Sequence, residues 1–259
     1  MVAQFWSCFV TRAPIIYGLI FNKRHERLRC RSATLCCTAS SNLVLLDRDG
    51  VINHDIGSPG VTNPSDFALI PGSARAVGLL KRMGCSTALV TNQSCVGKGL
   101  LSPSRLDDVH CKMAEMLRSE DTDAVIDRIY VCTSTRESGD IRMKPNPGMI
   151  LEAVENFRPD CSFFFVGDTV TDLQAASRAS AVTGKIIQRI LVSTGYGMSV
   201  MGGRIPTDPV VLMTADAAIE YTGGHDGMAA AAVLEEICPF LYVKDLGGAV
   251  DWLFEESHT

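Results

Sequence analysis

The sequence predicts an α/β protein, a single doubly wound domain whose parallel sheet is covered by helices on both faces and which carries no large cap. Short apolar runs that end in turn residues alternate along the chain with segments of helical periodicity. With 259 residues, 46% of them apolar, the chain is long enough to bury the core of one ordinary domain. Polar residues follow several of the predicted strands, and open α/β sheets bind ligands at that edge.

The first predicted strand, residues 43–46, leads directly into two carboxylates, Asp47 and Asp49, and Gly50 closes the turn. Neighbouring carboxylates repel each other, so a protein that gathers them usually binds a cation or shares a proton there. One carboxylate can act as a nucleophile and the other as an acid and base, with a hard cation holding the site together. Taken alone, the pair is also compatible with a solvated turn.

Two further strands and one loop continue this pattern. Apolar strands are predicted at 85–90 and 163–166, and polar groups suited to a phosphate or a metal follow them or precede a helix. In chain order these residues are Thr91, Asn92, Gln93, Lys144, Asp168 and Asp172. Each has a structural explanation when taken singly: the two aspartates as helix N-terminal charges, the lysine as a surface residue and the threonine as a turn former.

The remaining elements follow from periodicity and capping residues. Ser102 and Pro103 form a typical helix start. Helices are expected at 73–83, 103–117, 147–157, 172–179 and 246–254, and strands at 129–131, 185–192 and 240–243. The segment 195–227 is expected to be long and irregular. Loops 53–71, 94–102 and 132–143 should shape a fairly open site.

The chain divides by charge into residues 1–42, an expected targeting or disordered N-terminal extension, and residues 43–259, the folded domain. The extension contains six Lys or Arg residues and one Glu, which leaves 18 basic and 28 acidic residues, a formal charge of −10, in the domain. A basic, acid-poor leader is typical of a transit peptide and indicates a mitochondrial or plastid location, with a cytoplasmic extension as the alternative.

Composition also narrows the partners. A domain this acidic is a poor match for nucleic acid, which binds basic surfaces. No membrane partner is expected, because the apolar stretch 15–21 is too short to cross a bilayer. A monomer or small homo-oligomer is expected. The ten cysteines lack paired Cys-x-x-Cys spacing and are expected to be free thiols, and His54, His110 and His225 are expected to be ordinary loop or surface residues.

The order of the motifs resembles the haloacid dehalogenase (HAD) superfamily of phosphohydrolases. The matching segments are Asp-Arg-Asp-Gly at 47–50, Thr-Asn-Gln-Ser at 91–94, Lys-Pro-Asn-Pro-Gly-Met at 144–149, and Val-Gly-Asp at 166–168 with Asp-Leu-Gln-Ala-Ala at 172–176. Their wording is similar to the branch that holds heptose-bisphosphate phosphatase and histidinol-phosphate phosphatase. The resemblance covers about residues 43–195 and implies a Rossmann-like HAD fold.

The resemblance implies a magnesium-dependent phosphomonoester hydrolase that forms an aspartyl-phosphate on a small phosphorylated metabolite, a sugar phosphate, a sugar bisphosphate or a compound like histidinol phosphate. Asp47 would be the nucleophile and Asp49 the acid and base, while Thr91 and Lys144 would hold the phosphoryl oxygens. The implied Mg²⁺ ligands are Asp47, Asp49 through its backbone carbonyl, and Asp168, supported by Asp172. The expected substrate-binding residues are Gly50, Asn92, Gln93, Lys98 and Arg142.

The departures from this branch are informative. Its heptose-bisphosphate members carry a zinc loop of three cysteines and a histidine, of which only Cys132 is present here. The other positions hold Ser134, Asp140 and Arg142. Zinc needs about four good ligands, so we expect none. Met143 replaces an arginine that could grip a second phosphate, which predicts weak discrimination in favour of bisphosphates.

Three other functions remain alternatives. A polynucleotide 3′-phosphatase would share the Thr-Asn-Gln motif, but the acidic domain disfavours it. A non-catalytic phosphate-binding protein on the same fold would be favoured by loss of Asp47 or Asp49, and both are present. Transfer of the phosphoryl group to a sugar generally needs a larger cap to exclude water.

Overall fold

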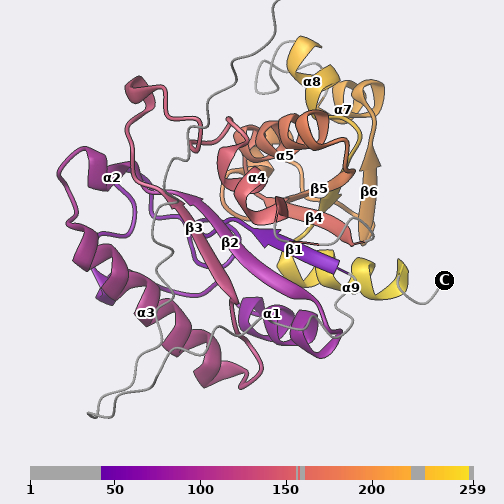
Figure 1. Ribbon diagram of the computed structural model, residues 1–259. Coiled ribbons are helices and arrows are strands. Elements are labelled where there is room, and N and C mark those ends of the chain that lie inside the picture. Colours follow the sequence, from indigo (N-terminus) through magenta and orange to yellow (C-terminus); the bar gives the residue numbers. More distant parts are fainter. Residues whose placement is uncertain (1–41, 156, 158–160, 223–230, 257–259) are drawn as a thin grey trace, which may run out of the picture. The chain divides into compact units, whose positions relative to one another are not determined.

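A computed structural model describes residues 42–155, 157, 161–222 and 231–256, and these form one α/β domain (Figure 1). The predicted extension 1–42 therefore lies outside the described residues except for Asn42. The strands are β1 (Asn42–Leu46), β2 (Ser86–Asn92), β3 (Arg128–Cys132), β4 (Ser162–Gly167), β5 (Ile187–Val192), β6 (Val210–Met213) and β7 (Phe240–Val243). They form one sheet in the order β3-β2-β1-β4-β5-β7-β6. The predicted fold class, a doubly wound domain without a large cap, is confirmed.

The helices lie largely where periodicity predicts them. They are α1 (Ser73–Arg82), α2 (Ser94–Gly97), α3 (Pro103–Glu120), α4 (Gly148–Glu155), α5 (Val170–Thr183), α6 (Gly197–Val200), α7 (Ala215–Thr222), α8 (Ala231–Ile237) and α9 (Leu246–Glu256). Short 3₁₀ turns occupy Pro64–Asp66 and Arg136–Ser138. The start of α3 is as predicted: the Ser102 hydroxyl accepts a hydrogen bond from the Arg105 N–H, and Pro103 fills the first turn.

Alternate residues of the strands face opposite sides of the sheet and pack on different helices. Val44 and Leu46 of β1 join the core formed with α1, α3 and α9. Leu43 and Leu45 join the core formed with α4 and α5. Figure 1 shows the same two layers, with α1, α3 and α9 on one side of the sheet and α4 and α5 on the other.

The expectation of an irregular segment at 195–227 is wrong in part. Residues 197–222 contain α6, β6 and α7, and β6 pairs antiparallel with β7 at the edge of an otherwise parallel sheet. The elements are four to eight residues long, which is too short for periodicity to reveal them. The pairing partner of β6 also comes later in the chain. Residues 223–227 lie outside the described part.

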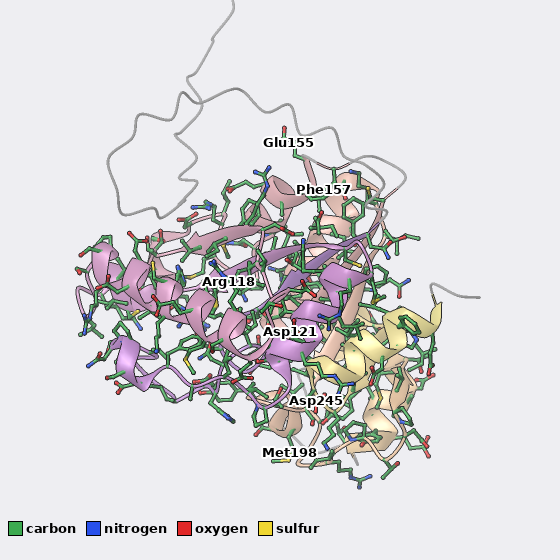
Figure 2. The ribbon with its side chains drawn as sticks, turned by 90° about the horizontal axis from the view of Figure 1, so that it is seen from below. Arg118, Asp121, Glu155, Phe157, Met198 and Asp245 are labelled. Atoms are coloured by element: carbon green, nitrogen blue, oxygen red, sulfur yellow. The ribbon has the colours of Figure 1, made fainter. Side chains whose placement is uncertain are left out.

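The strand order brings the motif-bearing loops together. β1 lies between β2 and β4, and the register aligns Leu46 with both Leu89 and Val166. The carboxyl ends of these strands therefore lie side by side. The strand order reverses between β1 and β4, and ligands usually bind at such a point in this architecture. Figure 2 shows two labelled residues that mark the two edges of the sheet. Phe157 lies between α4 and the start of β4, Met198 follows the end of β5, and they lie toward opposite ends of the view. Within the described ranges, no helix is long and apolar enough to cross a membrane.

Candidate active site

Three buried carboxylates converge at the carboxyl end of the central strands. Asp47 follows β1 and Asp168 follows β4, while Asp172 lies in the first turn of α5. Carboxylate oxygens of the three lie within 4.8 Å of one another. The Asp47 N–H donates to the Val166 carbonyl (3.0 Å), and Asp172 accepts from the backbone and hydroxyl of Thr169 as part of a capping box. The structure therefore brings together carboxylates that lie far apart in the sequence.

Lys144 places its ammonium among these carboxylates. Its Nζ lies 2.8 Å from Asp47 Oδ1 and 2.6 Å from Asp172 Oδ1, and it donates to the Val90 carbonyl at 2.9 Å. Burial by itself would lower the pKa of Lys144, but the attraction of Asp172 and Asp47 outweighs burial and raises it. The lysine is therefore a fixed positive charge at neutral pH.

One ammonium does not neutralise three carboxylates. Burial raises the pKa of Asp47 to about 7, although Lys144 opposes the shift. Burial, together with repulsion from Asp172 and Asp47, raises the pKa of Asp168 to about 9. A divalent cation would favour the ionised forms, and clustered carboxylate oxygens are the ligands that Mg²⁺ takes. The donor set and its unbalanced charge therefore fit a magnesium site.

Two glycines form a close cradle around Asp168. Gly50 (φ +82°) and Gly195 (φ +57°) are left-handed, and a Cβ on either would overlap Asp168 Oδ2. The Tyr196 N–H donates to the same oxygen at 2.8 Å, and the Thr194 hydroxyl donates to the Gly50 carbonyl at 2.6 Å. The loop after β5 is thus a fifth wall of the site.

The sequence analysis missed this wall although a signal was available. Ser193, Thr194 and Gly195 follow the predicted strand 185–192. Two of them are small polar residues at a strand end, the same pattern that identified the other four loops. The expectation of irregular structure from residue 195 onward obscured it.

Asp49 accepts hydrogen bonds on both carboxylate oxygens. Its Oδ1 accepts from Arg48 Nη2 (3.0 Å) and Asn53 Nδ2 (2.9 Å). Its Oδ2 accepts from Arg48 Nη2 (2.9 Å) and Gln93 Nε2 (3.0 Å). Arg48 and Asn53 are functional candidates that the sequence analysis did not single out, because a charged residue within a turn motif gives no sign of being buried.

The residues after β2 are tied into the same site. Thr91 is buried, and its hydroxyl accepts from Gln93 Nε2 at 3.0 Å. The Asn92 side chain binds the backbone of Lys144 in both directions, at 3.1 Å to its N–H and 3.0 Å to its carbonyl. Asn92 therefore positions the lysine loop, and Gln93 links Thr91 to Asp49.

Lys98 and Arg142 lie farther out. Lys98 is exposed at the end of α2. Arg142 forms an ion pair with Glu152, with Nε 2.7 Å from Oε1. Their assignment to substrate binding stays a prediction.

Hydrogen bonds through Asp140 hold the loop that precedes Lys144. Asp140 Oδ2 accepts from the Ser134 hydroxyl (2.5 Å) and the Cys132 thiol (3.6 Å), and Oδ1 accepts from the Arg142 N–H (2.8 Å). The hydrogen bond from Ser134, followed by the one from the Arg142 N–H, lowers the pKa of Asp140. The carboxylate at a position where the relatives were expected to carry a zinc ligand is thus the centre of this loop.

The expectation that His110 lies on the surface is wrong. It is on α3 with 8% of its surface exposed, and burial followed by repulsion from Arg48 lowers its pKa to about 3. Residues three or four positions apart lie on the same face of a helix, and His110 shares the buried face with Leu106 and Met113. His54 is exposed, and His225 lies outside the described residues.

Comparison with known proteins identifies the family. Residues 61–180 match the model for haloacid dehalogenase-like hydrolases. The D-glycero-beta-D-manno-heptose-1,7-bisphosphate 7-phosphatase of Pseudomonas aeruginosa is 31% identical over 173 residues, covering 66% of this chain and 92% of that protein. The enzyme of the same name from Bordetella bronchiseptica is 33% identical over 166 residues, covering 63% and 88%.

A solved structure agrees with the sequence relatives. The D,D-heptose 1,7-bisphosphate phosphatase of B. bronchiseptica, complexed with magnesium and phosphate, superposes with a TM-score of 0.63 and 26% identity over 83% of this chain and 99% of that chain. The chain belongs to the haloacid dehalogenase-like hydrolase family. The predicted superfamily and the predicted class of enzyme, a HAD-type phosphatase, are confirmed.

Proposed function

We propose that this protein is a magnesium-dependent phosphomonoester hydrolase that acts on a small phosphorylated sugar through an aspartyl-phosphate on Asp47. The observation that carries the proposal is the buried group formed by Asp47, Asp168 and Asp172 around Lys144. Such a group could receive a dianionic phosphate once a divalent cation offsets its remaining negative charge, and Lys144 already lies beside the reacting carboxylate.

The reaction would proceed in two displacements. A carboxylate oxygen of Asp47 forms a bond to phosphorus while the ester P–O bond breaks, and Asp49 gives its proton to the departing alkoxide. Asp49 then takes a proton from water, whose oxygen attacks phosphorus and breaks the bond to Asp47. The products are an alcohol and inorganic phosphate. The Thr91 hydroxyl would donate a hydrogen bond to a phosphoryl oxygen, and Lys144 would offset negative charge on the phosphoryl group.

Asp47, Asp168 and the backbone carbonyl of Asp49 would hold Mg²⁺, with Asp172 supporting the site through Lys144 and Thr169. Bound Mg²⁺ supplies charge neutralisation between the anionic nucleophile and the phosphate. The match to a phosphatase solved with magnesium and phosphate supports this assignment.

The relatives are named for a sugar bisphosphate substrate, but the loop before Lys144, residues 132–143, favours a broader range of substrates. Met143 is 7% exposed and packs in the core with α4, so it offers no contact to a second phosphate. Arg142 is paired with Glu152. We therefore expect kcat/KM for heptose bisphosphate to lie within about 100-fold of that for sugar monophosphates, a gap of about 2.7 kcal/mol.

The test is phosphate release by the purified full-length protein from heptose bisphosphate, a sugar monophosphate, histidinol phosphate and a 3′-phosphorylated oligonucleotide, with Mg²⁺ and with a chelator. We expect hydrolysis of the sugar phosphates that stops when the metal is removed. Preference for the oligonucleotide would support a polynucleotide 3′-phosphatase instead. Activity unaffected by chelation would contradict the assigned metal dependence.

A further inference from the structure

We propose that Arg48 is a positioning residue for catalysis, which acts by fixing the carboxylate of Asp49 and the amide of Gln93 together. This inference rests on the proposed function, because it assigns Arg48 a part in proton transfer by Asp49. Arg48 lies inside the first motif, between Asp47 and Asp49, and its side chain is fully buried.

The burial of Arg48 demands a specific partner. The side chain is 0% exposed, and it forms an ion pair with Asp49 at 2.9 Å. A buried guanidinium is costly unless it is paired and hydrogen-bonded. Among the described residues its Nε and Nη1 make no hydrogen bond, so the contacts of Nη2 with Asp49 and Gln93 account for its placement.

Arg48 also determines which way the Gln93 amide faces. Its Nη2 donates to Gln93 Oε1 at 3.1 Å, and this turns Nε2 toward Asp49 Oδ2 and the Thr91 hydroxyl, each at 3.0 Å. The opposite orientation would place an amide oxygen against the carboxylate and an N–H₂ against the guanidinium, so both contacts would become repulsive. One buried cation therefore fixes both the carboxylate of the acid and base and the amide that donates to it.

The consequence depends on the leaving group. Release of a sugar alkoxide needs a proton from Asp49, whereas a nitrophenolate leaves without one. A loosened Asp49 should therefore slow hydrolysis of sugar phosphates much more than that of p-nitrophenyl phosphate. The parameter to compare is kcat/KM, because it reports the steps up to departure of the leaving group and not the later attack by water.

The experiment compares wild type, Arg48→Met and Arg48→Lys on a sugar phosphate and on p-nitrophenyl phosphate with Mg²⁺. For Arg48→Met we expect kcat/KM to fall about 10- to 100-fold on the sugar phosphate and less than about threefold on the nitrophenyl ester. Arg48→Lys should be intermediate, since an ammonium can pair with Asp49, but the shorter lysine side chain does not reach the position from which Nη2 also meets Gln93.

Leu106→Ala is the matched control. Leu106 is buried beside Cys95 and Leu101, so truncation should destabilise the same region without contacting Asp49. Any effect of that variant should be equal on the two substrates. If Arg48→Met fails to fold, Arg48→Lys keeps a buried cation, tests the same contact, and should show a smaller loss with the same dependence on the substrate.

Equal losses on both substrates, or none, in a folded Arg48→Met or Arg48→Lys variant would overturn the positioning role. Failure of the wild type to hydrolyse either ester would instead count against the proposed function itself. The two failures are therefore distinguishable.

Discussion

Lys144 is the residue on which the electrostatics of the site depend most. It is buried and contacts Asp47 and Asp172 directly, so two of the three carboxylates share its single positive charge. The same contacts order Asp47 for attack. A buried charge with two partners contributes to stability and to catalysis at once, and the two contributions can be separated by experiment.

We expect Lys144→Met to lower kcat by about 10²–10³-fold, because a preorganised donor to the phosphoryl group is lost. Removing one member of a buried ion pair should also cost about 3–5 kcal/mol of unfolding free energy. Phosphate-release kinetics and urea unfolding measure the two effects. Lys244→Met, at an exposed lysine, is the control. A normal kcat in Lys144→Met would contradict the catalytic role of Lys144.

His110 should make stability depend on pH. Its folded-state pKa of about 3 lies below the ordinary value of 6.5, so below pH 6.5 the unfolded chain takes up a proton that the folded protein does not. The folded state should therefore lose about 1.4 kcal/mol per pH unit from this group as pH falls from 6.5 toward 3. Above pH 6.5 the group makes no such contribution.

Urea unfolding of wild type and His110→Gln at several pH values isolates this effect from the carboxylates. The free-energy difference between the two proteins should shift against the wild type by about 1.4 kcal/mol per unit between pH 6 and pH 4. Parallel pH profiles for the two proteins would show that His110 is not held neutral.

At the level of elements, the site is made of five loops that leave parallel strands at one edge. The order of motifs revealed four of them, because carboxylates, a threonine and a lysine after apolar strands have recognisable chemistry. The loop after β5 contributes mainly backbone: the Tyr196 N–H and the Gly195 Cα. Backbone groups leave little trace in a sequence, so the small polar residues Ser193 and Thr194 after the strand were the available signal.

The edge of the sheet was unpredictable for another reason. β6 is only four residues long and pairs with β7, which begins 27 positions after β6 ends. Its partner and direction depend on tertiary packing and not on local periodicity. The central strands were predictable because they are apolar on both faces.

Gly195→Ala tests the loop after β5. Its left-handed backbone disfavours any side chain, and the added Cβ would meet Asp168 and Gly50. We expect kcat/KM to fall at least about tenfold and the Mg²⁺ concentration for half-maximal activity to rise. Gly184→Ala is a matched control, since Gly184 has φ +68° but nothing within 4 Å of the added carbon. It should lose about 1 kcal/mol of stability and no activity.

At the scale of the whole molecule, the acidic domain and the basic leader are expected to be independent. We expect a fragment that begins at Ser40 to unfold at the same urea concentration as the full chain and to keep its kcat/KM, because the core strands begin at Asn42. Aggregation or inactivity of this fragment would mean that the leader contributes to the fold.

We further propose that residues 1–42 direct the protein to a mitochondrion or plastid, on the basis of their six basic residues and single Glu. A fluorescent protein fused after residue 42 should accumulate in one of these organelles. The same fusion with the basic residues changed to glutamine should remain in the cytoplasm. Cytoplasmic fluorescence from the unaltered fusion would favour the alternative of a cytosolic extension.

The most direct test of the central claim, that Asp47 carries the phosphoryl group, is to trap the covalent intermediate. Wild type and Asp47→Asn are mixed with Mg²⁺ and phosphate-labelled substrate, quenched in acid during turnover, digested and mapped by mass spectrometry. We expect label on the peptide that contains Asp47 in the wild type, and neither label nor turnover in Asp47→Asn. Label on another residue, or undiminished turnover in Asp47→Asn, would contradict the mechanism.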